Sequence, residues 1–220
     1  MCIGFFISVN PQVMKKPSKD TISRIALYLR TLQELSKTRI TATISSQDLA
    51  KELAISSDQL RRDLWYFGQF GKRGVGYSID SLKNKLSQIL GLDRSWNVCV
   101  CGTGNLGSAL LAYKGFKEQH LDIVACFDVD PKKIYKKKSG VMIYPLEDMR
   151  KMVTSLNIEI AIIATPINAA GAVMEALASC GIKAILNFAP VKLTAPLGVK
   201  LRNVDLSTEL FNLTYFLLQV

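Results

Sequence analysis

The sequence predicts an α/β chain in two parts: an N-terminal helix-turn-helix domain of the winged-helix kind and a C-terminal domain on a mostly parallel sheet. Three observations predict this. Apolar residues recur at helical spacing up to about residue 67, a basic, glycine-rich stretch follows, and strands and helices alternate from Trp96 onward. The expected segments are an extension at 1–17, a winged-helix domain at 18–80, a connecting helix at 81–95, a parallel-sheet domain at 96–206 and a terminal helix at 207–220.

Three helices and a hairpin are expected in the first domain. Ile22, Ile25 and Leu29 mark an amphipathic helix at about 21–36. Residues 45–48 offer N-caps for a second helix and residues 56–59 for a third, with only a short turn between the two. Four glycines among alternating apolar and basic residues at 68–79 predict a β-hairpin, the wing.

The third helix and the hairpin carry side chains suited to DNA. A glutamine and two arginines lie off the apolar face of the helix, and such side chains bind adenine and guanine edges in a major groove. A serine cap can bind a phosphate, and a basic hairpin tip can enter a minor groove. A solvated charged face is the alternative, but the ordered series of elements favours DNA. The candidates are Ser57, Gln59, Arg61, Arg62, Lys72 and Arg73.

The net charge supports a polyanionic partner for the first domain. The chain of 220 residues has a formal charge of +10. Residues 1–90 hold 14 Lys/Arg against 7 Asp/Glu, whereas residues 91–220 hold 14 against 11. Most of the excess therefore lies in the first part, although a solubilising surface would have the same composition.

A glycine-rich turn opens the second domain. Gly102-Thr103-Gly104-Asn105-Leu106-Gly107 follows an apolar run, and Asp128 closes the next one. This is the fingerprint of a Rossmann dinucleotide-binding domain: Gly102 permits the tight turn, Gly104 lets a pyrophosphate approach, and Gly107 lets helix and strand pack. The pyrophosphate would lie at the helix N-terminus. Asp128 would accept a hydrogen bond from a ribose 2′-hydroxyl and repel a 2′-phosphate, so NAD(H) is the expected cofactor.

The remaining elements complete the sheet. Strands are expected at 97–101, 122–127, 141–143, 159–164, 183–188 and 199–204, with helices at 105–114, 146–156 and 168–180. The tail from Ser207 is a markedly apolar helix, which must be covered either by its own domain or by a second subunit. A dimer is the favoured interpretation.

An NAD-dependent oxidoreductase with an accessory DNA-binding domain is the alternative function. The only histidine, His120, lies in a polar loop, and Lys183 and Lys192 have no supporting spacing. The residues after Trp96 leave no room for a substrate domain, so no catalytic residue is assigned.

The remaining features point to a protein of the cytoplasm. Five cysteines, an odd number without metal-ligand spacing, indicate reduced core thiols and no metal site. The apolar run at 3–9 is too short to span a bilayer, so no membrane association is expected.

Several motifs together resemble the Rex family of redox-sensing transcriptional repressors. The two long ones are Arg61-Arg62-Asp63-Leu64-Trp65-Tyr66-Phe67-Gly68 and Phe70-Gly71-Lys72-Arg73-Gly74-Val75-Gly76-Tyr77. The glycine turn and the segments 90–93, 127–131, 164–166, 187–190 and 204–206 follow in the same order. Trp65 departs from the pattern, since the family commonly has Ser there.

The resemblance implies a homodimer that binds a pseudo-palindromic double-stranded operator, has no protein substrate and exchanges its terminal helix between subunits. Such proteins bind operators when NADH is scarce and release them when NADH binds. Thr165 and Pro166 would line the phosphate or nicotinamide side of the cofactor, and Phe188 an apolar nicotinamide pocket. Tyr113 would lie near the nicotinamide. Arg24 and Asp205 would form a charged pair that couples the two domains.

Overall fold

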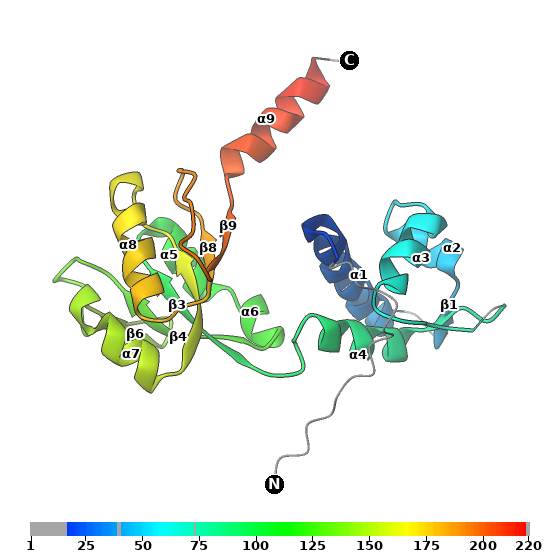
Figure 1. Ribbon diagram of the computed structural model, residues 1–220, viewed down its shortest axis with the longest axis horizontal. Helices are drawn as coiled ribbons and strands as arrows, with labels where there is room; N and C mark the ends of the chain where they lie inside the picture. The colour runs from blue at the N-terminus through cyan, green and yellow to red at the C-terminus, as the bar shows by residue number, and fades with distance from the viewer. Residues whose placement is uncertain (1–16, 39–40, 73, 219–220) are drawn as a thin grey trace, which may run out of the picture. The chain divides into compact units, whose positions relative to one another are not determined.

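The computed structural model describes residues 17–38, 41–72 and 74–218. The chain forms two compact units, and the boundary along the sequence lies between Asp93 and Arg94 (Figure 1). The extension expected at 1–17 lies outside the described residues except for Pro17, and so does Arg73.

The first unit is a small helical domain with a two-stranded sheet. Its elements are α1 (Lys19–Thr38), β1 (Thr43–Ile44), α2 (Ser46–Glu52), α3 (Ser57–Trp65), β2 (Tyr77–Ser78) and α4 (Ile79–Ile89). The core joins α1, α3 and α4 through the fully buried Ile25, Leu32, Leu60 and Leu86. The connecting helix expected at 81–95 thus begins earlier and packs within the first unit.

The helix-turn-helix has the expected N-cap chemistry. The hydroxyl of Ser45 accepts a hydrogen bond from Asp48 N at 3.0 Å, and that of Ser56 accepts one from Gln59 N at 3.1 Å. The N-cap of α3 is therefore Ser56, and Ser57, which we expected to act as a cap, is the first residue of the helix. Each cap satisfies an N–H group that the first helical turn leaves unpaired.

The wing differs from the simple hairpin predicted at 68–79. Within this loop the described part of the chain contains a single bridge, between Lys72 and Gly76, and β2 pairs instead with β1 in antiparallel register. Gly76 has φ +89°, and a Cβ there would lie 2.4 Å from Ile44 O. The close approach of the loop to β1 therefore requires glycine at this position.

A buried carboxylate fixes α3 against α1. Asp63 is 1% exposed and accepts hydrogen bonds from Arg24 Nε at 2.6 Å, Arg24 Nη2 at 2.7 Å and the Tyr28 hydroxyl at 2.7 Å. Gln59 Nε2 donates a further bond at 3.0 Å. Burial acts to raise the pKa of Asp63, but the bonds from Arg24 and Tyr28 outweigh it, and the pKa lies below its ordinary value.

The second unit is a seven-stranded sheet in the order β5-β6-β4-β3-β7-β8-β9, parallel except for the β5–β6 pair. Its strands are β3 (Trp96–Cys101), β4 (Leu121–Phe127), β5 (Lys137–Lys138), β6 (Val141–Tyr144), β7 (Ile158–Ile163), β8 (Ala184–Asn187) and β9 (Lys200–Asn203). The helices are α5 (Asn105–Ala112), α6 (Gly115–Glu118), α7 (Met149–Ser155) with a 3-10 turn before it, α8 (Ile167–Ser179) and α9 (Leu206–Leu217). The strand order reverses at β3, as in doubly wound folds.

Alternation along β3 gives the sheet two apolar faces. Val98 and Val100 pack in the cluster that contains Leu111 of α5, whereas Cys99 and Cys101 pack in the cluster that contains residues of α7 and α8. Successive strand residues point to opposite faces, so a continuous apolar run is needed when helices cover both. The cysteines of β3 are buried and free, as expected.

Replacing Asp63 with Asn tests the buried carboxylate. We expect Asp63→Asn to lower the free energy of unfolding by about 1.5–3 kcal/mol, because the bonds to a charged acceptor are lost. Chemical denaturation monitored by circular dichroism measures the change. Asp80→Asn is the control, since Asp80 pairs with Lys83 on the surface at 78% side-chain exposure and its loss costs at most about 1 kcal/mol. Equal effects of the two variants would contradict the proposed anchoring.

The same carboxylate predicts an acid dependence. Because the pKa of Asp63 is lowered by folding, its stabilisation is present above the unfolded pKa of about 4 and is lost as the pH falls through the folded pKa. We expect the stability difference between the wild type and Asp63→Asn to be constant from about pH 5 to 7 and to shrink below about pH 4.

Candidate functional sites

A cavity of about 550 Å³ lies at the carboxyl ends of the central strands, where doubly wound folds bind ligands. The predicted site residues that line it are Gly102, Thr103, Gly104, Leu106, Asp128, Thr165, Pro166 and Phe188. They follow β3, β4, β7 and β8, strands that adjoin in the sheet. The structure therefore brings together residues that are up to 86 positions apart in the chain.

The three glycines of the turn differ in what surrounds them. Gly102 has φ +92°, and a Cβ there would lie 2.6 Å from Ala164 O. A Cβ at Gly107 would lie 1.9 Å from Gly102 O, so α5 can approach the turn only with glycine here. At Gly104 a Cβ would meet nothing within 4 Å. Nothing in the fold itself requires glycine at this position, which faces the cavity at the N-terminus of α5.

Asp128 is held by four donors. Its Oδ2 accepts from Thr103 N at 2.9 Å, from the Thr103 hydroxyl, and from Lys133 Nζ at 3.2 Å, while its Oδ1 accepts from Asp130 N at 3.0 Å. A carboxylate has about four acceptor sites, two on each oxygen, so Oδ2 is fully occupied and Oδ1 keeps one site open. A ribose hydroxyl could therefore bond to Oδ1 without displacing a donor, and Lys133, with 37% side-chain exposure, is the one side-chain cation among the donors.

These contacts keep Asp128 ionised. Burial acts to raise its pKa, but the bonds from Thr103, Asp130 and Lys133 lower it far below the ordinary value. Lys133 also lies 3.7 Å from Asp130. The sequence analysis missed Lys133; the available signal was a lysine five residues after the acid that closes the second strand.

The cavity lining also has one unpaired polar atom and several apolar groups. Among the described residues, the Thr165 hydroxyl is the one buried side-chain polar atom without a hydrogen-bond partner. A buried hydroxyl without a partner costs free energy that a ligand bond would recover. Leu106, Val173 and Phe188 give the cavity apolar lining.

Three predicted cofactor residues are not in the lining: Asn105, Gly107 and Tyr113. Gly107 acts through packing, as described above, and Asn105 begins α5. Tyr113 ends α5, is 56% exposed and contacts Phe116 edge to face, with ring centres 5.1 Å apart. Its contact with a nicotinamide stays a prediction.

The DNA-binding candidates on α3 form two hydrogen-bonded groups. Arg61 Nη2 contacts Asp58 Oδ1 at 2.5 Å and the Ser57 hydroxyl at 3.2 Å, and its Nη1 donates to Ser46 of α2 at 2.9 Å. This arrangement joins the two helices of the motif and limits the positions of the Arg61 guanidinium.

The second group consists of Arg62, Gln59 and Asp63, and it orients the guanidinium of Arg62. Arg62 Nη2 donates to Gln59 Oε1 at 3.1 Å, and Gln59 in turn donates to the buried Asp63. Gln59 is half-buried rather than fully outward as we expected, and its amide is engaged at both ends. Hydrogen bonds within the first unit therefore orient the side chains on the exposed face of α3.

Lys72 lies beside α3 across a hollow of about 470 Å³. Ser45, Ser46 and Gln47 at the start of α2, Arg61, and the loop residues Phe70, Lys72 and Gly74–Tyr77 line it. Hydroxyls, a helix N-terminus and two cations around one hollow are suited to a phosphate group.

Arg24 and Asp205, the expected coupling pair, each have a partner within their own unit. Arg24 donates to Asp63 through Nε and Nη2, and Asp205 Oδ1 caps α9 by accepting from Ser207 N at 2.9 Å. Their mutual contact stays a prediction.

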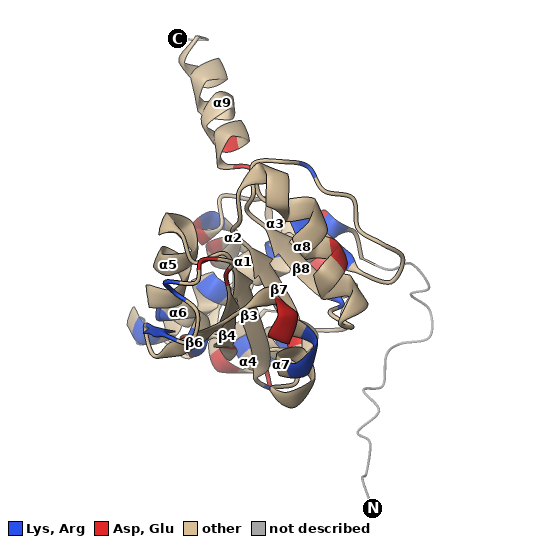
Figure 2. Ribbon diagram, turned by 90° about the vertical axis from the view of Figure 1, so that its left-hand side faces the viewer, with Lys and Arg blue, Asp and Glu red and all other residues tan. Residues whose placement is uncertain are grey.

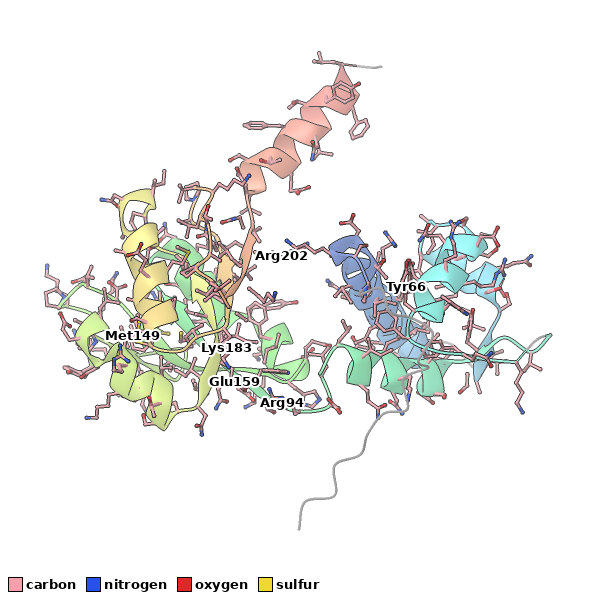
Figure 3. The ribbon with its side chains drawn as sticks, viewed as in Figure 1. Tyr66, Arg94, Met149, Glu159, Lys183 and Arg202 are labelled. Atoms are coloured by element: carbon pink, nitrogen blue, oxygen red, sulfur yellow. The ribbon has the colours of Figure 1, made fainter. Side chains whose placement is uncertain are left out.

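The residues considered for an enzyme lie away from the cavity. His120 and Lys183 directly precede β4 and β8, so they lie at the amino ends of strands whose carboxyl ends form the cavity. Lys183 is next to Glu159 on this opposite edge (Figure 3). Lys192 lines a separate hollow with Asp205.

The architecture is that of a ligand-responsive transcription regulator, with a winged-helix domain joined to a dinucleotide-type domain. The "CoA binding domain" family model matches residues 93–191, and the "Putative DNA-binding protein N-terminus" model matches residues 17–64. The redox-sensing transcriptional repressor Rex of Desulforamulus reducens is 45% identical over 200 residues, which cover 91% of this chain and 95% of that protein. Rex of Carboxydothermus hydrogenoformans is 46% identical, covering 91% and 96%. The chain belongs to the Rex family of redox-sensing transcriptional repressors.

Solved structures of a Rex-family repressor are also similar to this chain. RSP, a Rex-family repressor, in complex with β-NAD+ and operator DNA has a TM-score of 0.87 at 36% identity, covering 92% of this chain and 93% of that chain. The RSP complex with β-NADH has a TM-score of 0.83 at 34% identity, covering 92% and 95%. Membership of this family identifies a repressor rather than the oxidoreductase alternative.

The Gly104→Ala variant tests ligand binding without affecting the stability of the fold. Because a Cβ at this position meets nothing and φ is −66°, we expect unchanged stability. We expect NADH affinity to fall at least tenfold, since the Cβ would enter the space that a pyrophosphate needs. Fluorescence titration with NADH measures this, with Gly171→Ala in α8, also unhindered, as the control. Unchanged NADH affinity in Gly104→Ala would exclude the glycine turn as the pyrophosphate site.

Proposed function

We propose that this protein is a DNA-binding repressor that senses the NADH/NAD+ ratio, binding its operators when NADH is scarce and releasing them when NADH binds. The observation that carries the proposal is the cavity at the carboxyl ends of β3, β4, β7 and β8, where the glycine turn, the ionised Asp128 and the unpaired Thr165 hydroxyl meet. The cofactor is NAD(H), and a repressor that acts on bacterial-type operators would work in the cytoplasm.

The binding roles follow from the geometry. The N-terminus of α5 and Gly104 would hold the pyrophosphate, and Asp128 would bond the adenosine ribose through Oδ1. Phe188 and the buried Ala189 would surround the nicotinamide. An apolar pocket disfavours the positively charged oxidised ring, because burying a charge without a partner is costly. This difference in affinity is what a redox sensor requires.

The operator contacts come from the first unit. Arg62, Gln59 and Arg61 on α3 would face the major groove, while Ser57 and Lys72, with Arg73, would contact the backbone or the minor groove. The hydrogen bonds of Arg61 and Arg62 within the domain would limit their rotamers and so reduce the entropy lost on binding.

The terminal helix α9 supplies the dimer contact. It has no buried residue, its acidic residue Glu209 lies in the first turn, and the rest of its ribbon has the colour of uncharged residues in Figure 2. Leu206, Leu210, Leu213 and Leu217 repeat at spacings of four, three and four and are 59–75% exposed. A stripe of this kind is typical of a helix that packs on another subunit. The homodimer would then present two α3 helices to a pseudo-palindromic operator.

Coupling between the units would involve Arg24 and Asp205. Arg24 Nε and Nη2 face Asp63, so Nη1 is the nitrogen that a second carboxylate can approach without breaking the fork. An NADH-dependent contact of this kind would connect cofactor binding with the helix that Asp63 anchors.

Operator binding in the presence of each cofactor tests the function. We expect NADH to weaken binding to a duplex selected from a random pool by at least tenfold, and NAD+ to have little effect. We expect Arg62→Ala to lower affinity for that duplex by about 1–3 kcal/mol without changing NADH binding. Gel-shift titration measures both, and Arg30→Ala, an exposed cation of α1, is the control. Operator affinity that does not respond to NADH would overturn the sensor proposal.

Leu213→Asp tests the dimer contact. A carboxylate in the middle of the leucine stripe should give a monomer at micromolar concentration, because a charge would be buried without a partner. Light scattering after size exclusion measures the mass. Asn212→Asp adds the same charge at a polar position of α9 and should leave the dimer intact. Identical masses for the two variants would contradict the role of this stripe.

A further inference from the structure

Trp65 is an exposed aromatic residue within the cationic face of α3. It is 60% exposed, and the two arginines stand three and four residues before it. With Arg61, Arg62 and Tyr66, which Figure 3 labels at the end of the helix, it lines a hollow of about 470 Å³. An indole left in water among charges is costly unless a partner covers it.

The helix period places Trp65 on the outermost line of α3. Leu60, Asp63 and Leu64 are buried toward the domain core. At 3.6 residues per turn, Arg62 and Trp65 lie on the opposite side. Arg61 is held by Ser57 and Asp58 on the amino-terminal side of its own position, so it leaves the indole uncovered.

The charge around Trp65 indicates the class of partner, and the apolar indole indicates which chemical group of that partner it contacts. The flanking arginines select a polyanion, which for this family is duplex DNA. In the major groove the one apolar group that distinguishes base pairs is the C5-methyl of thymine. A flat apolar surface between two arginines is therefore complementary to a thymine that neighbours the bases read by the arginines.

We propose that Trp65 is a specificity-determining residue that contacts thymine methyl groups in each half-site of the operator. The inference rests on the proposed role of α3 as the recognition helix. It adds to that role a preference for thymine at a defined position, which the arginines alone do not supply.

Deoxyuridine substitution tests the contact, since it removes only the methyl group. A duplex selected from a random pool by the wild-type protein is the probe, with each thymine replaced in turn. We expect about a fourfold loss of affinity at one position per half-site, the value for one buried methyl. Trp65→Ser should show no loss at that position, and Trp65→Phe should keep most of it. Leu27→Ser, which removes an apolar residue 48% exposed on α1, should behave as the wild type.

The outcomes distinguish this contact from the interface as a whole. The proposal is wrong if no deoxyuridine substitution lowers the affinity of the wild type more than it lowers the affinity of Trp65→Ser. If Trp65→Ser instead loses the same affinity on every duplex, the indole packs on the sugar-phosphate backbone. If Arg62→Ala also binds as the wild type, the recognition helix itself is misassigned. Loss in Arg62→Ala with no methyl effect overturns the Trp65 contact alone.

Discussion

A carboxylate taken out of water must be surrounded by donors, and this constraint fixes both functional surfaces of the chain. Asp63 accepts hydrogen bonds from Arg24, Tyr28 and Gln59 and thereby fixes α3 against α1. Asp128 collects Thr103, Asp130 and Lys133 and thereby ties the glycine turn to the loop after β4. In each case the anion determines where neighbouring side chains stand, so the binding surfaces are formed before any ligand arrives.

Each of these clusters includes a long cation at its edge. The side chains of Arg24 and Lys133 are 31% and 37% exposed, whereas those of the carboxylates they pair with are at most 9% exposed. A partly exposed cation can contact a further anion from the solvent side, whereas removing it from the buried carboxylate would leave an unpaired charge at high cost. In the proposed function, a ribose bonds to Asp128 through Oδ1, and a second carboxylate approaches Arg24 through Nη1.

Exposed apolar residues mark the surfaces that need another molecule. The leucine stripe of α9 and the indole of Trp65 both lie in water in the single chain. The surroundings decide what covers each: α9 has a single charged residue, Glu209, and suits another apolar helix, whereas Trp65 stands between cations and suits DNA. The same physical signal therefore predicts two different partners.

Local chemistry in the sequence by itself determined most of the helices and strands, though not β1, β5 or α6, and also the glycine turn and the acid that follows it, because caps, periodicity and glycine spacing act over a few residues. It also indicated the apolar terminal helix and the basic helix-turn-helix. Only the tertiary structure decided that Ser56 rather than Ser57 caps α3, that β2 pairs with β1, and that Arg24 and Tyr28 meet Asp63. It alone placed Lys133 on Asp128 and left the Thr165 hydroxyl without a partner. These contacts join residues whose distance depends on how the elements pack, which no local pattern encodes.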